Sequence, residues 1–402
     1  LEPRDGIRLA DGLYESTAQR SIRQPNVVFG PKNPGVQHAR GVTINKGQVL
    51  IESPDCLFGG VRVTSTTTAM PDFFRVTGER TQLRDLDIAD INTKTPKSRV
   101  LVIDNTAHDS SVVGALFSHS TGYTAVLDIP KSGGFARNFS LTYSDFEHCT
   151  EHYFQAGQWG VPADSNGLFA FNSIRDCQSA ELKVSKFQCL YNDFYNVDRG
   201  FNLRIGDGNT IAHNRFVGGR RCTRVFGGKH RIAANIMSEA SLYSIMLCEV
   251  SLPEQFRKLP NAHHVVAHEI EISDNVIYTG KRGGILVGDQ QTGMLGTGDR
   301  AARAPNDRRW PHYEPYSPRS VSVVRNVFFA NGGRVLALRR PDTRPHRRDR
   351  YPDHPSLGKY IDVSANENTI FLSRDAVIGH VETDEFLAWE GRNMVSLVSV
   401  RR

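Results

Sequence analysis

Short runs in which apolar and polar residues alternate recur along the chain, each with an Asn or Asp beside an apolar pair. Residues 210–216 and 268–275 show the pattern clearly. Alternation with a period of two predicts short β-strands. From residue 172 to residue 235 the asparagines are about 20 to 22 residues apart, and later steps are about twice as long. The positions that carry the pattern are Asp145, Asn172, Asn192, Asn214, Asn235, Asn275, Asn326 and Asn368.

This repeat predicts an all-β chain folded as a parallel β-helix solenoid. A single coil cannot bury its apolar face, whereas stacked coils form one continuous core. Asn suits the turns because it tolerates left-handed backbone angles and can hydrogen-bond to its counterpart in the next coil. A leucine-rich repeat has a similar period, but its leucine spacing and helical segments are missing from this sequence.

The same reading predicts one solenoid domain over residues 1–402. Residues 1–60 are expected to form N-terminal coils, from which processing could have removed a cap. Residues 290–318 and 341–355 are expected to be inserted loops, and residues 380–402 a C-terminal cap. A further excursion is expected near residues 253–267, and a short capping helix within the last segment.

Composition narrows the class of protein. With 39% hydrophobic and 23% charged residues, the chain is typical of a globular protein, and no apolar run is long enough for a transmembrane helix. The net charge of +6 favours a polyanionic partner, either nucleic acid or an acidic polysaccharide. No nucleic-acid-binding motif is present, so we expect no nucleic acid and no membrane insertion. The first residues carry no signal segment, although a secreted or periplasmic protein could have lost one.

The six cysteines include no CxxC pair, so a zinc ribbon is not expected. We expect the cysteines to be buried thiols. The phosphate-binding, HExxH and GxSxG motifs are absent as well. Tyr191 and Tyr195 are expected to lie in the core. Singly, Arg199, Arg220 and Arg221 are expected to be solvated surface residues.

Two polar strands stand out as candidate chemistry. In residues 181–186, Glu181 and Lys183 share one face of a strand, and Lys186 stands where the strand ends and its amine can reach a cleft. In residues 200–206, Asn202 and Arg204 share the polar face of the next predicted strand. If these strands stack as neighbouring coils, Lys186 and Arg204 end on one surface. The alternative is an ordinary sheet with solvated Lys and Arg side chains.

Three stretches in this region resemble polysaccharide lyase family 6, the alginate lyase and chondroitinase B group of right-handed β-helix lyases. Residues 181–186 resemble the family segment E-x-x-x-S-K, residues 202–206 resemble N-x-R-H-G, and residues 224–230 resemble R-x-x-G-x-x-H. Residues 11–14 are similar to an early D-G-x-Y. The likeness covers roughly residues 140 to 240, and elsewhere only the architecture agrees.

The resemblance implies a lyase that cleaves next to a uronic acid by β-elimination, with Lys186 as the base and Arg204 as its partner. The uronate carboxylate must be neutralised before the C5 proton can leave, and a lysine base works only when its pKa falls towards neutrality. The implied substrate-binding residues are Asn202, Lys183, Arg224, Lys229 and His230. A histidine satisfied by backbone groups is the alternative for His230. Alginate is the favoured substrate, and chondroitin or dermatan sulfate comes second.

The chain departs from the family pattern at two places. Calcium-using members carry two Glu residues two positions apart plus an Asn from the preceding coil. Here Glu181 matches the second Glu, but Ser179 stands at the place of the first. One carboxylate is few for an ion with 6–8 oxygen ligands, so we expect no required cofactor, with Ca²⁺ at Glu181 as the alternative. Lys183 could supply positive charge instead, or pair with Glu181. Ile205 replaces the family His.

Two other classes of function stay open. A β-helix glycoside hydrolase needs clustered carboxylates, and its expected signatures are absent. A non-catalytic polysaccharide-binding solenoid would bind the polymer without turnover. A rise in absorbance at 235 nm from a new double bond would identify a lyase.

Overall fold

The computed structural model describes part of the chain as strands and turns, in two compact units. Unit 1 comprises Leu1–Gln158 and Ala163–Asp198, and unit 2 comprises Trp159–Pro162 and Arg199–Arg402. No helix that could span a membrane occurs in the described part. The described residues are 6–9, 12–15, 19–23, 26–31, 42–45, 48–65, 72–91, 99–127, 136–157, 164–249, 267–290, 318–338, 361–373, 376–381 and 393–397.

Several expectations fall outside those ranges. The interiors of the expected loops 290–318 and 341–355, the excursion near 253–267 and the expected capping helix are not described. Of the expected C-terminal cap, only two strand segments are described, residues 380–381 and 393–397. The division of residues 1–402 into a single solenoid domain with these inserts stays a prediction.

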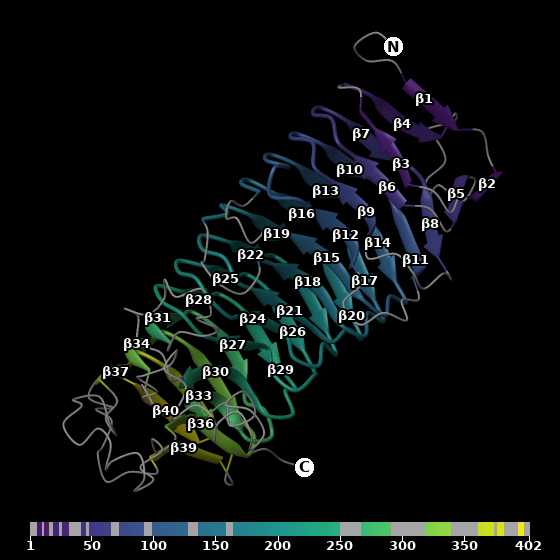
Figure 1. Cartoon of the computed structure of the whole chain (residues 1–402). Coiled ribbons are helices and arrows are strands. Elements are labelled where there is room, and N and C mark those ends of the chain that lie inside the picture. Colours follow the sequence, from purple (N-terminus) through teal and green to yellow (C-terminus); the bar gives the residue numbers. More distant parts are fainter. Residues whose placement is uncertain are drawn as a thin grey trace, which may run out of the picture. The chain divides into compact units, whose positions relative to one another are not determined.

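In unit 1, three successive strands along the chain belong to three different parallel sheets, and the next three strands repeat this order (Figure 1). We name the sheets A, B and C. Sheet A contains β1 (Gly6–Leu9), β4 (Val28–Pro31), β7 (Leu57–Gly59), β10 (Gln82–Arg84), β13 (Ser111–Val113), β16 (Ser140–Thr142), β19 (Leu168–Ala170) and β22 (Gln188–Leu190). Sheet B contains β2 (Gly12–Glu15), β5 (Val42–Asn45), β8 (Arg62–Ser65), β11 (Asp87–Ile91), β14 (Leu116–Ser118), β17 (Asp145–Glu147), β20 (Ser173–Arg175) and β23 (Asp193–Tyr195). Sheet C contains β3 (Gln19–Ile22), β6 (Gln48–Ile51), β9 (Asp72–Val76), β12 (Arg99–Ile103), β15 (Tyr123–Leu127), β18 (His152–Ala156) and β21 (Ser179–Leu182).

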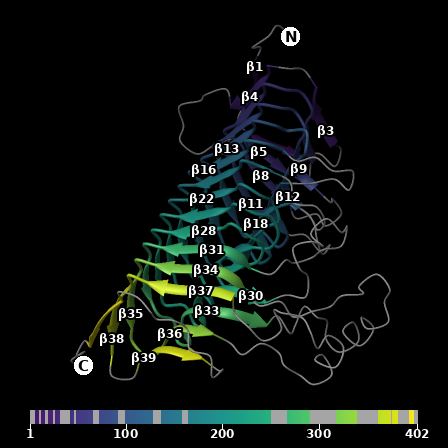
Figure 2. The ribbon, with the colours of Figure 1, turned by 90° about the vertical axis from the view of Figure 1, so that its left-hand side faces the viewer.

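Unit 2 has the same order of strands, in which every third strand belongs to the same sheet. Figure 2 shows four neighbouring strands of sheet A, β28, β31, β34 and β37. Sheet A contains β25 (Thr210–Ala212), β28 (Arg231–Ala233), β31 (His268–Ser273), β34 (Arg319–Val324) and β37 (Ile361–Asn366). Sheet B contains β26 (Arg215–Val217), β29 (Ile236–Ser238), β32 (Val276–Tyr278), β35 (Val327–Ala330), β38 (Thr369–Leu372) and β40 (Met394–Leu397). Sheet C contains β24 (Phe201–Leu203), β27 (Thr223–Val225), β30 (Tyr243–Glu249), β33 (Gly283–Gln290), β36 (Gly333–Leu338) and β39 (Ala376–Val381).

Each turn of the chain therefore adds one strand to each sheet, which confirms the predicted all-β parallel β-helix. The core of unit 1 follows from the register of these strands. Leu141 on β16 pairs with Val112 on β13 and with Phe169 on β19, and all three are buried. Phe117 and Phe146 occupy equivalent positions on sheet B and stack with ring centroids 4.7 Å apart. Every coil thus repeats the apolar contact of the coil before it, which is why the sequence period is so regular.

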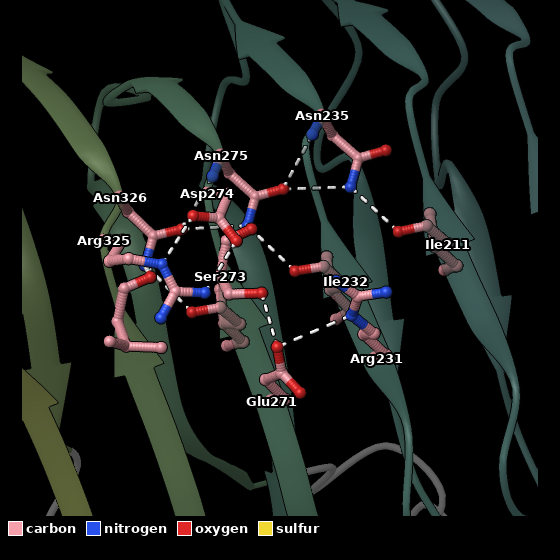
Figure 3. A network of polar contacts seen from close by, with 12 residues as sticks. Ile211, Arg231, Ile232, Asn235, Glu271, Ser273, Asp274, Asn275, Arg325 and Asn326 are labelled. Atoms are coloured by element: carbon pink, nitrogen blue, oxygen red, sulfur yellow. Dashed lines mark hydrogen bonds and ion pairs between the residues drawn. The ribbon is translucent and has the colours of Figure 1, made fainter.

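The predicted asparagine ladder is confirmed. In unit 2 the side-chain amide of Asn235 donates to Asn275 Oδ1 at 3.0 Å, and that of Asn275 donates to Asn326 Oδ1 at 2.9 Å (Figure 3). In unit 1, Asn172 donates to Asn192 Oδ1 in the same way at 3.0 Å. These side chains are buried, and their carboxamides also donate to backbone carbonyl groups of the coil before them.

The reason given for asparagine needs one correction. The left-handed residue is the one that precedes each ladder asparagine, such as Phe171, Tyr191, Asp274 and Arg325, and not the asparagine. The asparagine is required for its amide, which crosslinks coils. The residue before it makes the turn, so its side chain points away from the core.

This geometry also corrects the placement of two tyrosines. Tyr191 and Tyr195 are 51% and 56% exposed and do not lie in the core. Tyr191 occupies the left-handed turn position and stacks on Phe171, with ring centroids 5.2 Å apart. Tyr195 pairs with exposed Arg175 on the outer face of sheet B. All six cysteines are buried free thiols, as expected.

Candidate functional site

Lys186 lies just beyond strand β21 in unit 1, where the sequence placed it. Its backbone is left-handed, with a φ of 57°, and its side chain is 60% exposed. The amine contacts Asp164 Oδ2 at 2.5 Å, and Asp164 forms a β-bridge with Ser185. The turn breaks the strand alternation at Lys186, so the amine reaches the surface while Val184 stays in the core. Sequence reasoning missed Asp164, although 22 residues, about one coil, separate it from Lys186.

Glu181 and Lys183 face the same way, as predicted, but the structure buries both. Their side chains are 6% and 4% exposed, and Lys183 Nζ lies 3.2 Å from Glu181 Oε2. An ion pair this deep is screened little by solvent. The prediction that Lys183 could pair with Glu181 is therefore confirmed, whereas its role as a substrate ligand stays a prediction.

The preceding coil completes a polar cluster around this pair. His152 on β18 pairs in register with Ser179, and its Nδ1 lies 2.7 Å from Ser179 Oγ. Its Nε2 lies 3.7 Å from Glu181 Oε2, and its ring stacks on Tyr123 with centroids 5.1 Å apart. Burial raises the pKa of the Tyr123 hydroxyl, and the negative charges of Glu181 and Glu151 raise it further. We refer to Tyr123, His152, Ser179, Glu181 and Lys183 as the β21 cluster. His152 and Ser179 are 27 residues apart, which is about one coil. This spacing is the sequence signal that could have predicted their contact.

The β21 cluster does not fit the calcium ion that the resembling family implies. Calcium takes 6–8 oxygen ligands at about 2.3–2.6 Å. Glu181 already faces an ammonium group, and the groups near it are the neutral hydroxyl of Ser179, the imidazole of His152 and the neutral carboxamide of Gln155, which pairs with it in register. Glu181 is therefore the one carboxylate of the β21 cluster. Among the residues that the structure describes, no group of three His, Cys, Asp or Glu side chains could hold a metal. That no cofactor is required stays a prediction.

Unit 2 gathers buried arginines around one aromatic ring. Arg204, directly after β24, and Arg224, on β27, are 9% and 8% exposed, and their guanidinium carbons lie 5.6 and 5.2 Å from the centre of the Phe226 ring. Arg224 Nε also donates to Cys248 Sγ at 3.0 Å. Both arginines are thus close enough to the ring for cation–π attraction. The sequence placed Arg204 and Arg224 one coil apart, and the structure agrees.

Asn202 and Arg221 extend this arrangement. Asn202 pairs in register with Arg224, and its Oδ1 lies 3.5 Å from Arg221 Nε. Arg221 is 9% exposed, so the expectation that it is a solvated surface residue is wrong. Arg199 and Arg220 are exposed, as expected. We refer to Asn202, Arg204, Arg221, Arg224 and Phe226 as the arginine cluster.

His230 is held by backbone groups, which is the alternative considered for it above. Its Nδ1 accepts from the Asn209 amide at 3.1 Å, so its Nε2 carries the proton and donates to the Phe226 carbonyl at 2.9 Å. The ring is 1% exposed, and burial lowers its pKa to about 4. This placement favours a structural histidine that stays neutral. Lys229, next to it, is exposed and left-handed.

His268 was missed by sequence reasoning. It is 1% exposed, and a side chain at Gly228 would come within 2.2 Å of its ring. Gly228 therefore has to be glycine for this imidazole to pack against the turn after β27. A glycine in that turn with a histidine in the next coil is the sequence signal.

No family model and no curated protein matches the chain. Solved structures do. A PL6 alginate lyase in complex with a trisaccharide is 13% identical with a TM-score of 0.70, covering 95% of this chain and 82% of its own. A mannuronic acid-specific polysaccharide family 6 lyase from human gut microbiota is 15% identical with a TM-score of 0.70, covering 98% and 86%. The periplasmic alginate epimerase AlgG is 12% identical with a TM-score of 0.55, covering 98% and 80%. Such identities show a shared fold, and that fold is the one the motif resemblance implies.

Proposed function

We propose that this protein is a polysaccharide lyase that cleaves an anionic, uronate-containing polysaccharide, with alginate as the first substrate to test. The observation that carries the proposal is the exposed amine of Lys186 at the end of β21, on a fold shared with alginate lyases. A periplasmic or secreted location would suit such a substrate, and one similar fold belongs to a periplasmic enzyme.

Lys186 is assigned as the base and Arg204 as its partner. In β-elimination the base takes the proton from C5, the C4–O4 bond breaks, and a C4=C5 double bond remains. A proton then returns to the departing O4 oxygen. A guanidinium that is always charged suits the stabilisation of the enolate-like intermediate, which carries extra negative charge. Asp164 would hold the Lys186 amine in place before substrate binds.

The arginine cluster supports an anionic substrate. Arg204, Arg221 and Arg224 are each buried to about nine-tenths, so water screens their charges little. Arginine also matches the planar geometry of a carboxylate. The chain as a whole carries a net charge of +6, which favours the approach of a polyanion.

The test is absorbance at 235 nm during incubation with polymannuronate, polyguluronate, chondroitin sulfate and dermatan sulfate. We expect a rise with at least one alginate block and a loss of more than about a hundredfold in the Lys186→Ala variant. Lys281→Ala is the matched control, because Lys281 is an exposed lysine in a turn far along the chain. It should leave the rate unchanged.

Other outcomes would redirect the proposal. A rise on chondroitin or dermatan sulfate alone would keep the lyase and change the substrate. New reducing ends without absorbance at 235 nm would indicate a hydrolase. Exchange of the C5 hydrogen with deuterated solvent, without cleavage, would indicate an epimerase. Binding without any of these reactions would refute enzymatic activity and favour a binding solenoid.

A further inference from the structure

Lys183, directly after strand β21, is a buried cation beside Glu181, the one carboxylate of the β21 cluster. Lys183 Nζ lies 3.2 Å from Glu181 Oε2, and both side chains are almost fully buried. Glu181 and Ser179 are two positions apart on the strand, so they share a face, and His152 lies opposite Ser179 in the register. A cation that entered this cluster from solvent would have to sit where the ammonium group already is.

Electrostatics oppose a second cation there. A divalent ion bound to Glu181 would be held within a few ångströms of the Lys183 ammonium, and charges in a buried place repel more strongly than in water. Ser179, whose hydroxyl lies 2.7 Å from His152 Nδ1, and Gln155, which pairs in register with Glu181, are both neutral and add no negative charge to offset this repulsion. The cluster is therefore built for an internal cation.

We propose that Lys183 is the built-in counter-cation of Glu181, which takes the place of a divalent metal ion and makes the site independent of metal. Its link to catalysis rests on the proposed function. Lys183 lies three residues before Lys186, in the segment that follows β21. Its backbone N–H donates to the Ala156 carbonyl at 2.7 Å, and its ammonium group is paired with Glu181, so both its backbone and its side chain are held in the segment that leads to Lys186. Lys183 is thus a positioning residue for Lys186.

The first arm of the experiment measures the metal alone. Calorimetric titration of the wild type with CaCl₂ should show no binding, and EDTA should change neither the melting temperature nor the rate on the active polymer. Calcium binding, or a rate that EDTA abolishes and calcium restores, would overturn the proposal.

The second arm changes the charges. Lys183→Met keeps the length of the side chain but leaves Glu181 buried without this partner, so the melting temperature should fall. The Lys183→Met/Glu181→Gln double variant removes both charges of the pair, so the melting temperature should recover most of that loss. An unchanged melting temperature in Lys183→Met would overturn the proposal.

The third arm tests whether the β21 cluster binds calcium once a second carboxylate is added and the lysine is removed. Lys183→Ala with Ser179→Glu removes the internal cation and puts two carboxylates two positions apart on the strand. We expect this variant to bind calcium and to melt at a higher temperature when calcium is added, whereas Ser179→Glu with Lys183 retained should not. Equal calcium binding by these two variants would show that Lys183 does not exclude metal.

The experiment distinguishes failure of the proposed lyase activity from failure of the proposed role of Lys183. If the wild type cleaves no polymer, the lyase assignment falls, while the calcium titrations and melting temperatures still decide the role of Lys183. If the wild type is active, kcat should fall more than KM rises in Lys183→Met, because a displaced base slows the chemical step, whereas loss of a substrate contact would raise KM. A change confined to KM would refute the positioning role.

Discussion

Asn275 is the residue at which the coil-to-coil ladder can be tested most directly. It is 0% exposed, and its amide nitrogen shares its two hydrogens among three acceptors, Asn326 Oδ1, Ile232 O and Ser273 O, each 2.9 Å away. Its Oδ1 accepts from the backbone N–H of Asn235 at 2.9 Å. Figure 3 shows how this one side chain joins the coil before it to the coil after it. The perturbation is Asn275→Ala.

The size of the effect follows from those contacts. Truncation leaves the buried N–H of Asn235 without the acceptor described above, which costs about 1–3 kcal/mol, and each further hydrogen bond lost contributes about 1 kcal/mol. The carbonyl oxygens keep other bonding capacity, so the three donated bonds are not all lost at full value. We therefore expect a loss of about 3–5 kcal/mol in the free energy of unfolding.

The assay is urea unfolding followed by far-ultraviolet circular dichroism, with hydrogen exchange to locate the effect. A stacked-coil protein need not unfold in a single step, so the exchange data identify which strands open. Protection should fall in β28, β31 and β34, the strands that the ladder joins. Asp274→Asn is the matched control, because it changes the adjacent exposed turn residue and weakens only its exposed ion pair with Arg325, keeps a residue that tolerates left-handed angles and leaves the ladder intact.

A loss below about 1 kcal/mol in Asn275→Ala would refute the reasoning, because it would mean that a buried N–H without its acceptor costs less than one ordinary hydrogen bond. Loss of protection spread evenly over the chain would also contradict it. That result would place the effect on the unfolded state rather than on the contacts of three coils.

Two further predictions concern pH and the exposed aromatic rings. His230 has a folded pKa of about 4 against 6.5 when exposed, so its contribution is present above pH 6.5 and is lost as pH falls towards 4, about 3 kcal/mol in all. Urea midpoints between pH 8 and pH 4 should show this slope, and His230→Gln should flatten it; equal slopes would exclude His230 as the cause. Phe171 stacks between Tyr143 and Tyr191 with centroids 5.1 and 5.2 Å away, so Phe171→Ala should lower stability by about 1–3 kcal/mol in the same urea assay. An unchanged midpoint would mean that the exposed stack contributes nothing.

The architecture of this protein was predictable because the sequence pattern that specifies it is local and recurs in each coil. Alternating residues specify strands, and asparagines about one coil apart specify both the period and the contact between coils. Lys186 could be placed at a strand end for the same reason. The asparagine ladder from Asn235 to Asn326 shows that even an inserted segment between coils does not disturb the register.

The environment of each candidate residue could not be predicted in the same way. Lys183 and Arg221 have charged side chains of the kind that usually lies on the surface, yet both are buried. Their burial depends on the residues that the surrounding coils place around them. Asp164 and His152 meet their partners only through stacking, since they lie 22 and 27 residues away in the sequence. Tyr191 was expected in the core, but the left-handed turn directs its ring outward.

Period and alternation thus specify which residues form strands and which coil each belongs to, because both depend on backbone geometry that every coil repeats. The accessibility of a side chain and the groups that it pairs with depend on what its own coil and the neighbouring coils place around it. At Glu181 the sequence showed that a second carboxylate is missing, and only the tertiary structure shows that the Lys183 ammonium group lies 3.2 Å from Glu181 Oε2 with both side chains buried.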